Sequence, residues 1–376
     1  MATAELLADI EAGNLRKSVS ESQYNEVLAK TYSNLREKYG DEQNYKFDPE
    51  KHLSYYSADP LDQHKYHETR RLTMAELGLT NKNQISPIGV SDPFPLFTDE
   101  ATDIMKMECL RKDIFLKYAR ESFNSTSGMD CIVRGYAKTK GTINTQFVHD
   151  AWTHPKTIEL ISTMAGVELE VIMDYEIAQV NIGVTPKEVA ENQKNAVEAA
   201  DDMPAIIGWH YDSYPFVCVL MLSDTSAMIG GETYLRMGDS KLACVLGPQK
   251  GSAAVLQGRL IEHLANKPVG ATERITMVTS YRAKNSIIHE GSVLGTVKPE
   301  INFGTRPDDF YPDWVKYRSQ VIKDRLDALV KQCETNEKFE RKITMDTLRD
   351  IEAYLHHTTK EMDITPEEWD VIAKKG

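Results

Sequence analysis

The sequence predicts a mainly β core with a helical jacket, because the pattern of residues changes along the chain. Short runs rich in Val, Ile and Tyr recur between residues 170 and 282, separated by Gly, Pro, Asp and Ser. This alternation is typical of a β-sandwich or β-barrel. Helical periodicity dominates before this block and returns in the charged chain after about residue 310. We therefore expect a β core near 130–300, covered by helices from both ends of the chain.

The chain ahead of the core predicts helices joined by irregular coil. Apolar residues recur at helical spacing, and we expect Gly40 and Gly166 to end two of the helices. Turn-forming residues such as Asp59-Pro60 and Ser86-Pro87 concentrate in 40–98, which predicts extended chain laid over the core. The helices expected in this part span 2–12, 21–39, 99–121 and 155–165.

The β-rich block and the C-terminal part give the remaining elements. A polar stretch rich in Ala, Glu and Lys at 184–202 predicts a helical insertion between two strands. The strands expected in the block span 170–183, 216–222, 232–237, 252–257 and 274–282. The helices expected after the block span 312–333, 340–358 and 365–375.

The length of 376 residues fits two domains or one elaborated domain. We divide the chain into a helical and irregular N-terminal jacket at 1–129, a catalytic β core at 130–305 and a C-terminal helical extension at 306–376. We expect these parts to fold together as one structural domain. The charged C-terminal stretch is a candidate solvated jacket or homodimer surface.

Charge and composition narrow the classes of partner. The chain carries 44 Lys and Arg against 57 Asp and Glu, a net charge of −13. This balance argues against a nucleic-acid or anionic-membrane partner, because those need a basic surface. The longest apolar run, Phe216–Leu222, is too short to cross a bilayer. Five scattered cysteines without CxxC spacing argue against a disulfide framework or a structural zinc site. Because no signal peptide is apparent either, we expect a cytoplasmic protein.

One carboxylate and two imidazole side chains form the candidate metal site. His210 and Asp212 are two positions apart, and on a strand such residues point to the same face. Alone this pair is uninformative, because it arises often by chance. His263 adds a third ligand from within the same β-rich block. Two imidazoles and one carboxylate form a facial triad, which leaves one side of a metal open and favours Fe(II).

Two further features accompany these ligands. Arg274 and Thr276 open another expected strand eleven positions after His263, and strand alternation puts both on one face. An arginine there offers a bidentate fork for a carboxylate. Residues 230–233, with the sequence Gly-Gly-Glu-Thr, predict a tight turn that enters a strand.

With these residues in this order, the sequence resembles the Fe(II)/2-oxoglutarate-dependent oxygenases over roughly 170–285. The matching features are His210-x-Asp212, the distal His263 and Arg274-x-Thr276, together with the Gly-Gly turn. The resemblance implies a double-stranded β-helix, or jelly roll. It also implies Fe(II), with 2-oxoglutarate and O₂ as co-substrates and succinate and CO₂ as products.

The same resemblance assigns roles to individual residues. His210, Asp212 and His263 would bind iron. Arg274 would pair with the distal carboxylate of 2-oxoglutarate, and Thr276 would hydrogen-bond it. Asn181 would contact the other end of the co-substrate. Strand parity groups Asn181 with two further residues as candidates to face the lumen, namely Tyr175 and Gln179.

Candidate substrate residues come from parity and position. Arg282 lies eight positions after Arg274, so on an unbulged strand it points the same way and could bind an anionic group of the substrate. Residues 283–303 leave the last strand and could fold over the site. Further candidates for substrate packing are Tyr211, Tyr214, Phe216, Ile301 and Phe303.

We expect a small-molecule substrate, because a helical jacket and two long insertions favour an enclosed pocket. The β block is similar to oxygenases of fungal specialised metabolism, which implies an amino-acid-derived, polyketide or terpenoid intermediate and hydroxylation, desaturation or ring closure. Arg282 favours a substrate that bears a carboxylate. Three alternatives stay open. One is a facial-triad iron oxidase that does not use 2-oxoglutarate, another is a metal-dependent cupin-like hydrolase or isomerase, and the third is a non-catalytic jelly-roll binding module.

Overall fold

The structure, a computed structural model, describes residues 18–368 apart from 58, 81–82, 122–128, 199–204, 267 and 303. Its centre is a large antiparallel sheet of ten strands. These strands are β1 Arg71–Thr73, β2 Ile88–Ser91, β3 Phe94–Pro95, β4 Ala119–Glu121, β5 Met129–Val133, β8 Leu169–Val171, β9 Gln179–Val184, β11 Phe216–Met221, β14 Ser252–Leu256 and β16 Glu273–Ala283. The order is β1-β2-β14-β11-β16-β9-β5-β4, with β3 on β14 and β8 on β16.

A second, four-stranded antiparallel sheet lies against the large one. Its strands are β10 Ala205–His210, β12 Thr233–Arg236, β13 Leu242–Val245 and β15 His263–Asn266, in the order β10-β15-β12-β13. Val217 and Leu256 from the large sheet pack in one buried cluster with Leu235 and Val245 from the small sheet, so the two sheets face each other. A separate ladder joins β6 Lys138–Thr139 to β7 Thr142–Ile143.

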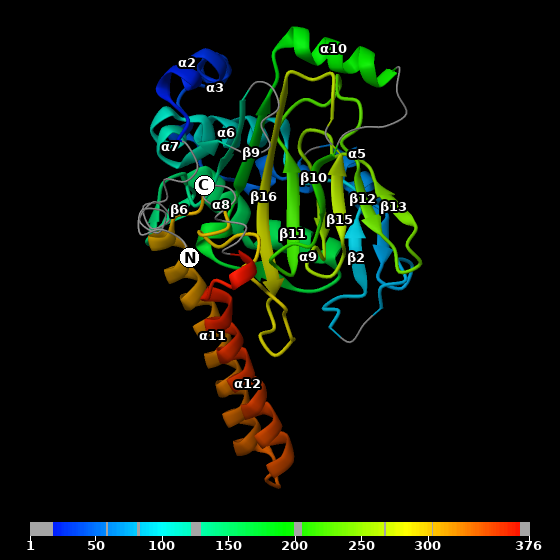
Figure 1. Ribbon diagram of the computed structural model, residues 1–376, viewed down its shortest axis with the longest axis vertical. Helices are drawn as coiled ribbons and strands as arrows, with labels where there is room; N and C mark the ends of the chain where they lie inside the picture. The colour runs from blue at the N-terminus through cyan, green and yellow to red at the C-terminus, as the bar shows by residue number, and fades with distance from the viewer. Residues whose placement is uncertain are drawn as a thin grey trace.

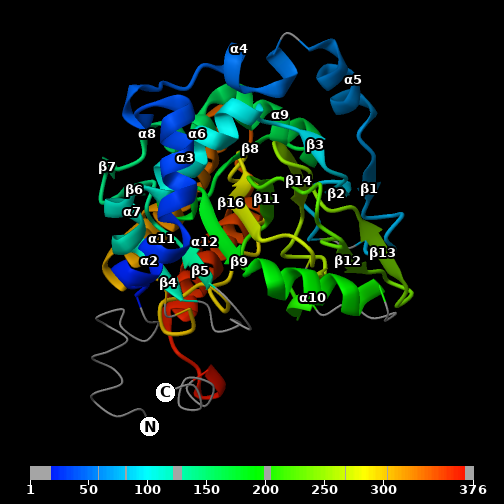
Figure 2. The ribbon, with the colours of Figure 1, turned by 90° about the horizontal axis from the view of Figure 1, so that it is seen from above.

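Helices cover the opposite face of the large sheet (Figure 2). Ile275 and Met277 of β16 point into the main core, and the indole N–H of Trp152 lies 3.0 Å from the sulfur of Met277. The alternate residues of β16, including Arg274 and Thr276, therefore face the small sheet. The helices before the last strands are α2 Glu21–Val27, α3 Ala29–Tyr39, α4 Pro49–His52, α5 Pro60–Glu68, α6 Asp99–Leu110, α7 Lys112–Tyr118, α8 Gln146–Thr153 and α9 Pro155–Ala165.

Three helices lie at the two ends of the molecule (Figure 1). The expected insertion between strands is helix α10, Lys187–Glu198, which joins β9 to β10. At the other end, α11 Pro307–Thr335 and α12 Arg341–Met362 form an antiparallel hairpin that projects from the body. Within the described part of the chain, no helix is both long enough and apolar enough to span a bilayer.

The predicted elements agree with the observed ones in part. The helix expected at 99–121 is divided into α6 and α7, and its last three residues form strand β4. Strands β10, β13 and β15 lie outside the predicted strand ranges. The strand expected at 170–183 is broken, because the short 3₁₀ helix Asp174–Glu176 and Ala178, with φ of +59°, separate β8 from β9. Tyr175 therefore lies off the strand and packs with α11, so its parity with Asn181 is wrong. The region 40–98 also contributes strands β1 to β3 to the large sheet rather than only irregular coil. The predicted helix 2–12 lies outside the described residues, as does most of 365–375.

Candidate metal centre

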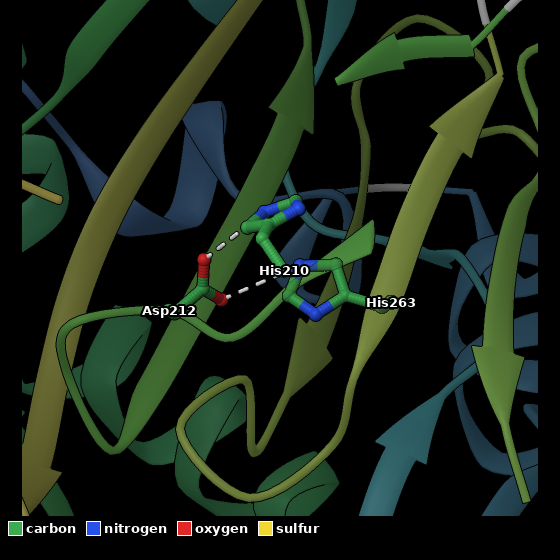
Figure 3. A group of neighbouring side chains, drawn as sticks. All are labelled: His210, Asp212 and His263. Carbon is green, nitrogen blue, oxygen red and sulfur yellow. Dashed lines mark ion pairs between the residues drawn. The ribbon is translucent and has the colours of Figure 1, made fainter. Parts of the chain in front are cut away.

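His210, Asp212 and His263 converge at one end of the small sheet (Figure 3). His210 is the last residue of β10 and His263 the first of β15, and the two are directly paired across the ladder. Their ring centroids are 4.3 Å apart. One ligand atom from each of the three side chains lies within 4.8 Å of the other two. The sequence-predicted set is thus brought together, although the segments that carry it are far apart along the chain.

Asp212 reaches this group in a different way from the one predicted. It lies beyond the end of β10, so strand alternation does not place it beside His210. Its backbone N–H instead donates to the carbonyl of Gly258, at 2.9 Å. A Cβ at Gly258 would lie only 1.7 Å from Asp212 Oδ2. The carboxylate is therefore held against a backbone site that accepts no side chain.

Backbone carbonyls orient both imidazoles. His210 Nδ1 lies 2.8 Å from the carbonyl of Gly208, and His263 Nδ1 lies 2.9 Å from the carbonyl of Ile261. A carbonyl only accepts hydrogen bonds, so Nδ1 carries the proton in each ring and Nε2 keeps its lone pair. These Nε2 atoms face Asp212, at 3.7 Å from Oδ1 for His210 and 3.6 Å from Oδ2 for His263. Metal-binding histidines are usually held in this way, with the nitrogen that does not bind the metal donating to a carbonyl or carboxylate.

The electrostatics of the group suit a cation. Burial lowers the pKa of His210, and the neighbouring His263 lowers it further, which favours the neutral ring that a metal needs. Asp212 Oδ2 is buried and has no hydrogen-bond partner among the described residues. A buried oxygen without a donor is costly, and a bound cation would satisfy it. Two neutral imidazoles and one carboxylate therefore fit a divalent transition metal with open positions.

The predicted co-substrate residues line the face of β16 that looks toward the small sheet. Thr276 is buried and pairs with Asn181 of β9, while Arg274 pairs with Gly183. The Nε of Arg274 is buried without a hydrogen-bond partner in the described structure. Desolvation lowers the pKa of this guanidinium to about 10, and the charge of Asp130 offsets part of that shift. A half-buried arginine whose Nε is buried without a partner fits an anionic ligand.

Asp130 and Gly183 are two neighbours of this arginine that sequence reasoning missed. Asp130 of β5 pairs with Gly183, which in turn pairs with Arg274, so the three share one row across the sheet. A Cβ at Gly183 would lie 3.1 Å from Asp130 Oδ1. The missing side chain thus leaves room for the carboxylate beside the arginine. No local sequence pattern marks these residues, because the row exists only once three distant strands have paired.

Arg282 has the predicted parity but a different environment. The β11–β16 pairing is unshifted from Phe216↔Tyr281 to Met221↔Thr276, so Arg282 does lie on the same face as Arg274. Its guanidinium is buried, forms an ion pair with Glu170 of β8 and donates to Ser286 Oγ at 3.2 Å. It also lies over the ring of Tyr317 in α11. The expectation of a charge available to substrate is therefore corrected, because Glu170 lies directly opposite on the paired strand.

The apolar candidates for substrate packing are dispersed. Phe216 is 1% exposed and belongs to the core between the large sheet and the helices, so it does not face the site. Tyr214 is buried and donates its hydroxyl to Glu176. Tyr211 is 47% exposed beside the metal ligands. Ile301 lies in a turn where its N–H donates to Lys298, and Phe303 lies outside the described residues.

The segment after the last strand passes beside the metal loop, in line with the prediction for 283–303. The N–H of Val293 donates to the carbonyl of Ser213, which follows Asp212. The hydroxyls of Ser213 and Thr296 are 2.6 Å apart. Arg259, next to Gly258, donates to the carbonyl of Gly291 at 2.8 Å. The loop that carries Asp212 and the loop that contains Gly258 are therefore both hydrogen-bonded to this segment.

Comparison with known proteins gives matches only in structure. No family model matches the chain, and no curated protein matches it by sequence. A 2OG-Fe(II) oxygenase family oxidoreductase from Burkholderia pseudomallei aligns at 16% identity over 46% of this chain and 75% of that chain, with a TM-score of 0.31. A Pseudomonas putida prolyl-4-hydroxylase aligns at 16% identity over 52% of this chain and 94% of that chain, with a TM-score of 0.33.

The epimerase SnoN from nogalamycin biosynthesis, described as α-ketoglutarate-dependent, aligns at 17% identity over 44% of this chain and 66% of that chain, with a TM-score of 0.31. These neighbours include the family that the sequence resembles. At such TM-scores the likenesses do not bear on activity, which must be inferred from the site itself.

We predict that Gly258→Ala lowers Mn(II) or Fe(II) affinity by about 10–100-fold, the usual effect of displacing the support of a metal ligand. The new methyl group would collide with Asp212. Isothermal titration calorimetry measures the change. The matched control is Gly208→Ala, since a Cβ at Gly208 meets nothing within 4 Å. Equal affinity in both variants would contradict the proposed role of Gly258.

We predict that metal affinity is constant above about pH 6.5 and falls below it, because protons then compete for the imidazoles. The lowered pKa of His210 keeps this ring neutral at and above its usual titration range. The expected fall is about tenfold per pH unit for each imidazole that must lose a proton. Mn(II) titrations from pH 5 to pH 8 test it, and an affinity that rises toward acid pH would exclude imidazole ligands.

We predict that Arg282→Ala destabilises the protein by ~1–3 kcal/mol, because it breaks a partly buried ion pair and leaves Glu170 without its cation. Burial already raises the pKa of Glu170, so the loss is smaller at acid pH, where this carboxyl is protonated. Urea unfolding at pH 5 and pH 8 measures both effects. Unchanged stability would contradict a stabilising ion pair with Glu170, and Arg282 would again be a candidate for binding substrate.

Proposed function

We propose that the protein is a non-haem Fe(II)/2-oxoglutarate-dependent oxygenase that oxidises a C–H bond of a small organic molecule. The observation that carries the proposal is the pairing of two unsatisfied groups. Asp212, with its two oriented imidazoles, offers a cation site with open positions, and half-buried Arg274, with its unpartnered Nε, offers an anion site. A ligand that bridges the two needs a metal-binding group at one end and a carboxylate at the other. 2-Oxoglutarate has this form.

The strand order supports a double-stranded β-helix for the core. From β9 to β16, the chain crosses repeatedly between the two sheets: β9, β11, β14 and β16 join the large sheet, while β10, β12, β13 and β15 form the small one. Two facing antiparallel sheets that exchange strands in this way are the pattern of a jelly roll. The metal site then lies between the sheets, where β10 ends and β15 begins.

The chain's own residues would bind, orient and shield the reactants. His210 and His263 would offer Nε2, and Asp212 a carboxylate oxygen, on one side of the ion. Iron held in this way supplies, with 2-oxoglutarate and O₂, the oxidising power for C–H cleavage, with succinate and CO₂ as by-products. The open side would leave room for the two co-substrates.

Arg274 would fix the far carboxylate of 2-oxoglutarate, with Thr276 and Asn181 as neighbouring hydrogen-bonding groups on the paired strands. Because the guanidinium is partly buried, its attraction for a carboxylate is stronger than it would be in water. Asp130 already balances part of its charge. This partial balance favours a single carboxylate over a more highly charged anion.

The substrate we propose is a small organic molecule. The observed ion pair between Arg282 and Glu170 removes the reason for preferring a carboxylate-bearing substrate. Tyr211 is the aromatic candidate that is exposed beside the ligands. Whether the outcome is hydroxylation, desaturation or ring closure depends on the position of the substrate relative to the ion.

We predict that 2-oxoglutarate binds only after Fe(II) under anaerobic conditions, and that Arg274→Ala weakens this binding by about 100-fold or more, because a buried charge-assisted pair is lost. The metal-to-ligand absorption band of the complex reports binding. The matched control is Arg282→Ala, which removes a buried arginine from the same face of the same strand. It should keep 2-oxoglutarate affinity once circular dichroism shows that it is folded.

Admission of O₂ to the loaded protein should then release succinate. Binding of 2-oxoglutarate without metal, or equal affinity in Arg274→Ala and the unchanged protein, would contradict the proposal. Turnover that persists without 2-oxoglutarate would favour the oxidase alternative, and turnover without O₂ the hydrolase or isomerase.

A further inference from the structure

The face of β16 that looks toward the small sheet continues beyond the candidate co-substrate residues. Val278 and Ser280 follow Thr276 at alternate positions, so they point the same way. Val278 packs against the buried cluster between the two sheets, in agreement with this direction. On the neighbouring strand β9, Gln179 pairs with Val278 and lies two residues before Asn181. We call Gln179, Val278 and Ser280 together the lumen wall.

The lumen wall lies level with the loop that holds the candidate metal ligands. Ser280 pairs with Val217 of β11, and Val217 pairs in turn with Leu256 of β14. Gly258 follows Leu256 by two residues and lies directly against the carboxylate of Asp212. One row across the large sheet therefore leads from the wall to the metal loop. A molecule bound on the open side of the ion would face this wall.

The wall offers no free charge to a substrate. Strands β9 and β16 lie wholly within the described residues, and the charged side chains that they turn toward the small sheet are Arg274 and Arg282. Arg274 belongs to the proposed co-substrate site, and Arg282 forms an ion pair with Glu170. Leu235 and Val245, which the small sheet turns toward the large one, are apolar. An ionic group of a substrate would therefore lose its hydration here without gaining a counter-charge.

Gln179 gives the wall an oriented hydrogen-bonding group. Its side chain is half-buried, and its amide N–H donates to Asn181 Oδ1 at 3.4 Å. With the amide turned this way, the carbonyl Oε1 is an acceptor, and no described residue donates to it. The hydroxyl of Ser280 likewise has no hydrogen-bond partner among the described residues, although the residue is only 5% exposed. An O–H or N–H of a bound molecule would satisfy the Gln179 carbonyl.

We propose that Gln179 binds the substrate, and that the substrate is an uncharged organic molecule that carries an O–H or N–H group. The inference rests on the proposed oxygenase function and names the substrate class for the same site. The carbonyl of Gln179 would accept the hydrogen bond, the hydroxyl of Ser280 would bind a second polar group, and Val278 would pack against the carbon skeleton. Gln179 is thus a specificity-determining residue that favours alcohols and amides over carboxylic acids and protonated amines.

The anaerobic complex of the full chain with Fe(II) and 2-oxoglutarate tests the substrate class without turnover. Its metal-to-ligand absorption band should shift when a molecule binds beside the ion. The probes are sets of small molecules that share a carbon skeleton and differ in carrying an alcohol or amide, a carboxylate or an ammonium group. The neutral members should shift the band at lower concentration than their charged counterparts.

Two outcomes of this titration would overturn the proposal. If no neutral probe shifts the band, or if the charged members of the sets bind as tightly as the neutral ones, the substrate class is wrong. A band that never forms would instead contradict the proposed function, and the inference would fall with it. The two failures are therefore distinguishable.

Gln179→Leu tests the residue itself, because it keeps a side chain of similar size and removes the acceptor. The tightest neutral probe should bind this variant about tenfold more weakly, as expected for one lost hydrogen bond. The O-methylated or N-methylated form of that probe, which has no donor, should bind the variant and the unchanged protein equally. A merely structural role of Gln179 would weaken both probes alike, so the discrimination between them is the readout.

The matched variant is Gln179→Glu, which keeps an acceptor oxygen and adds a negative charge. It should still discriminate between the probe and its methylated form, and it should bind the ammonium member of the same set more tightly than the unchanged protein does. Titration of 2-oxoglutarate first checks that each variant forms the complex. Full discrimination in Gln179→Leu, or equal loss of discrimination in both variants, would overturn the role of Gln179.

Discussion

The candidate metal centre depends on the pairing of β10 with β15. This ladder places His210 directly opposite His263, and its register shifts between Ile207 and His210. Such an irregularity re-aims the side chain that follows it. Both strands hold their imidazoles in the same way, through a carbonyl two residues earlier. The backbone, rather than neighbouring side chains, therefore fixes which nitrogen of each ring faces the shared ion.

Two glycines determine how closely the remaining groups approach. Gly258 lets Asp212 lie against the backbone at the metal, and Gly183 leaves space for Asp130 beside Arg274. In both places the essential feature is a side chain that is missing. Close backbone contact thus shapes both the cation subsite and the anion subsite.

Sequence alone predicted the metal ligands and strands β9, β11, β12, β14 and β16, because alternating apolar runs and the order His210, Asp212 and His263 are local signals. It did not predict β10 and β15, the strands that carry the two imidazoles. It placed Asp212 correctly for the wrong reason, since β10 ends at His210 and a loop supplies the carboxylate. The parity of Arg282 was also right, yet its partner Glu170 lies on a strand paired only in the folded chain. Gly183 and Gly258 could not be predicted, because their role depends on what packs over them.

The central claim is that one ion is held by His210 Nε2, His263 Nε2 and a carboxylate oxygen of Asp212. A crystal structure of the protein with Mn(II), with the ion located by its anomalous scattering, tests it directly. The account predicts one peak bonded to these three atoms at about 2.0–2.2 Å, with the other positions filled by water or co-substrate. A peak elsewhere, or imidazoles bonded through Nδ1, would contradict it.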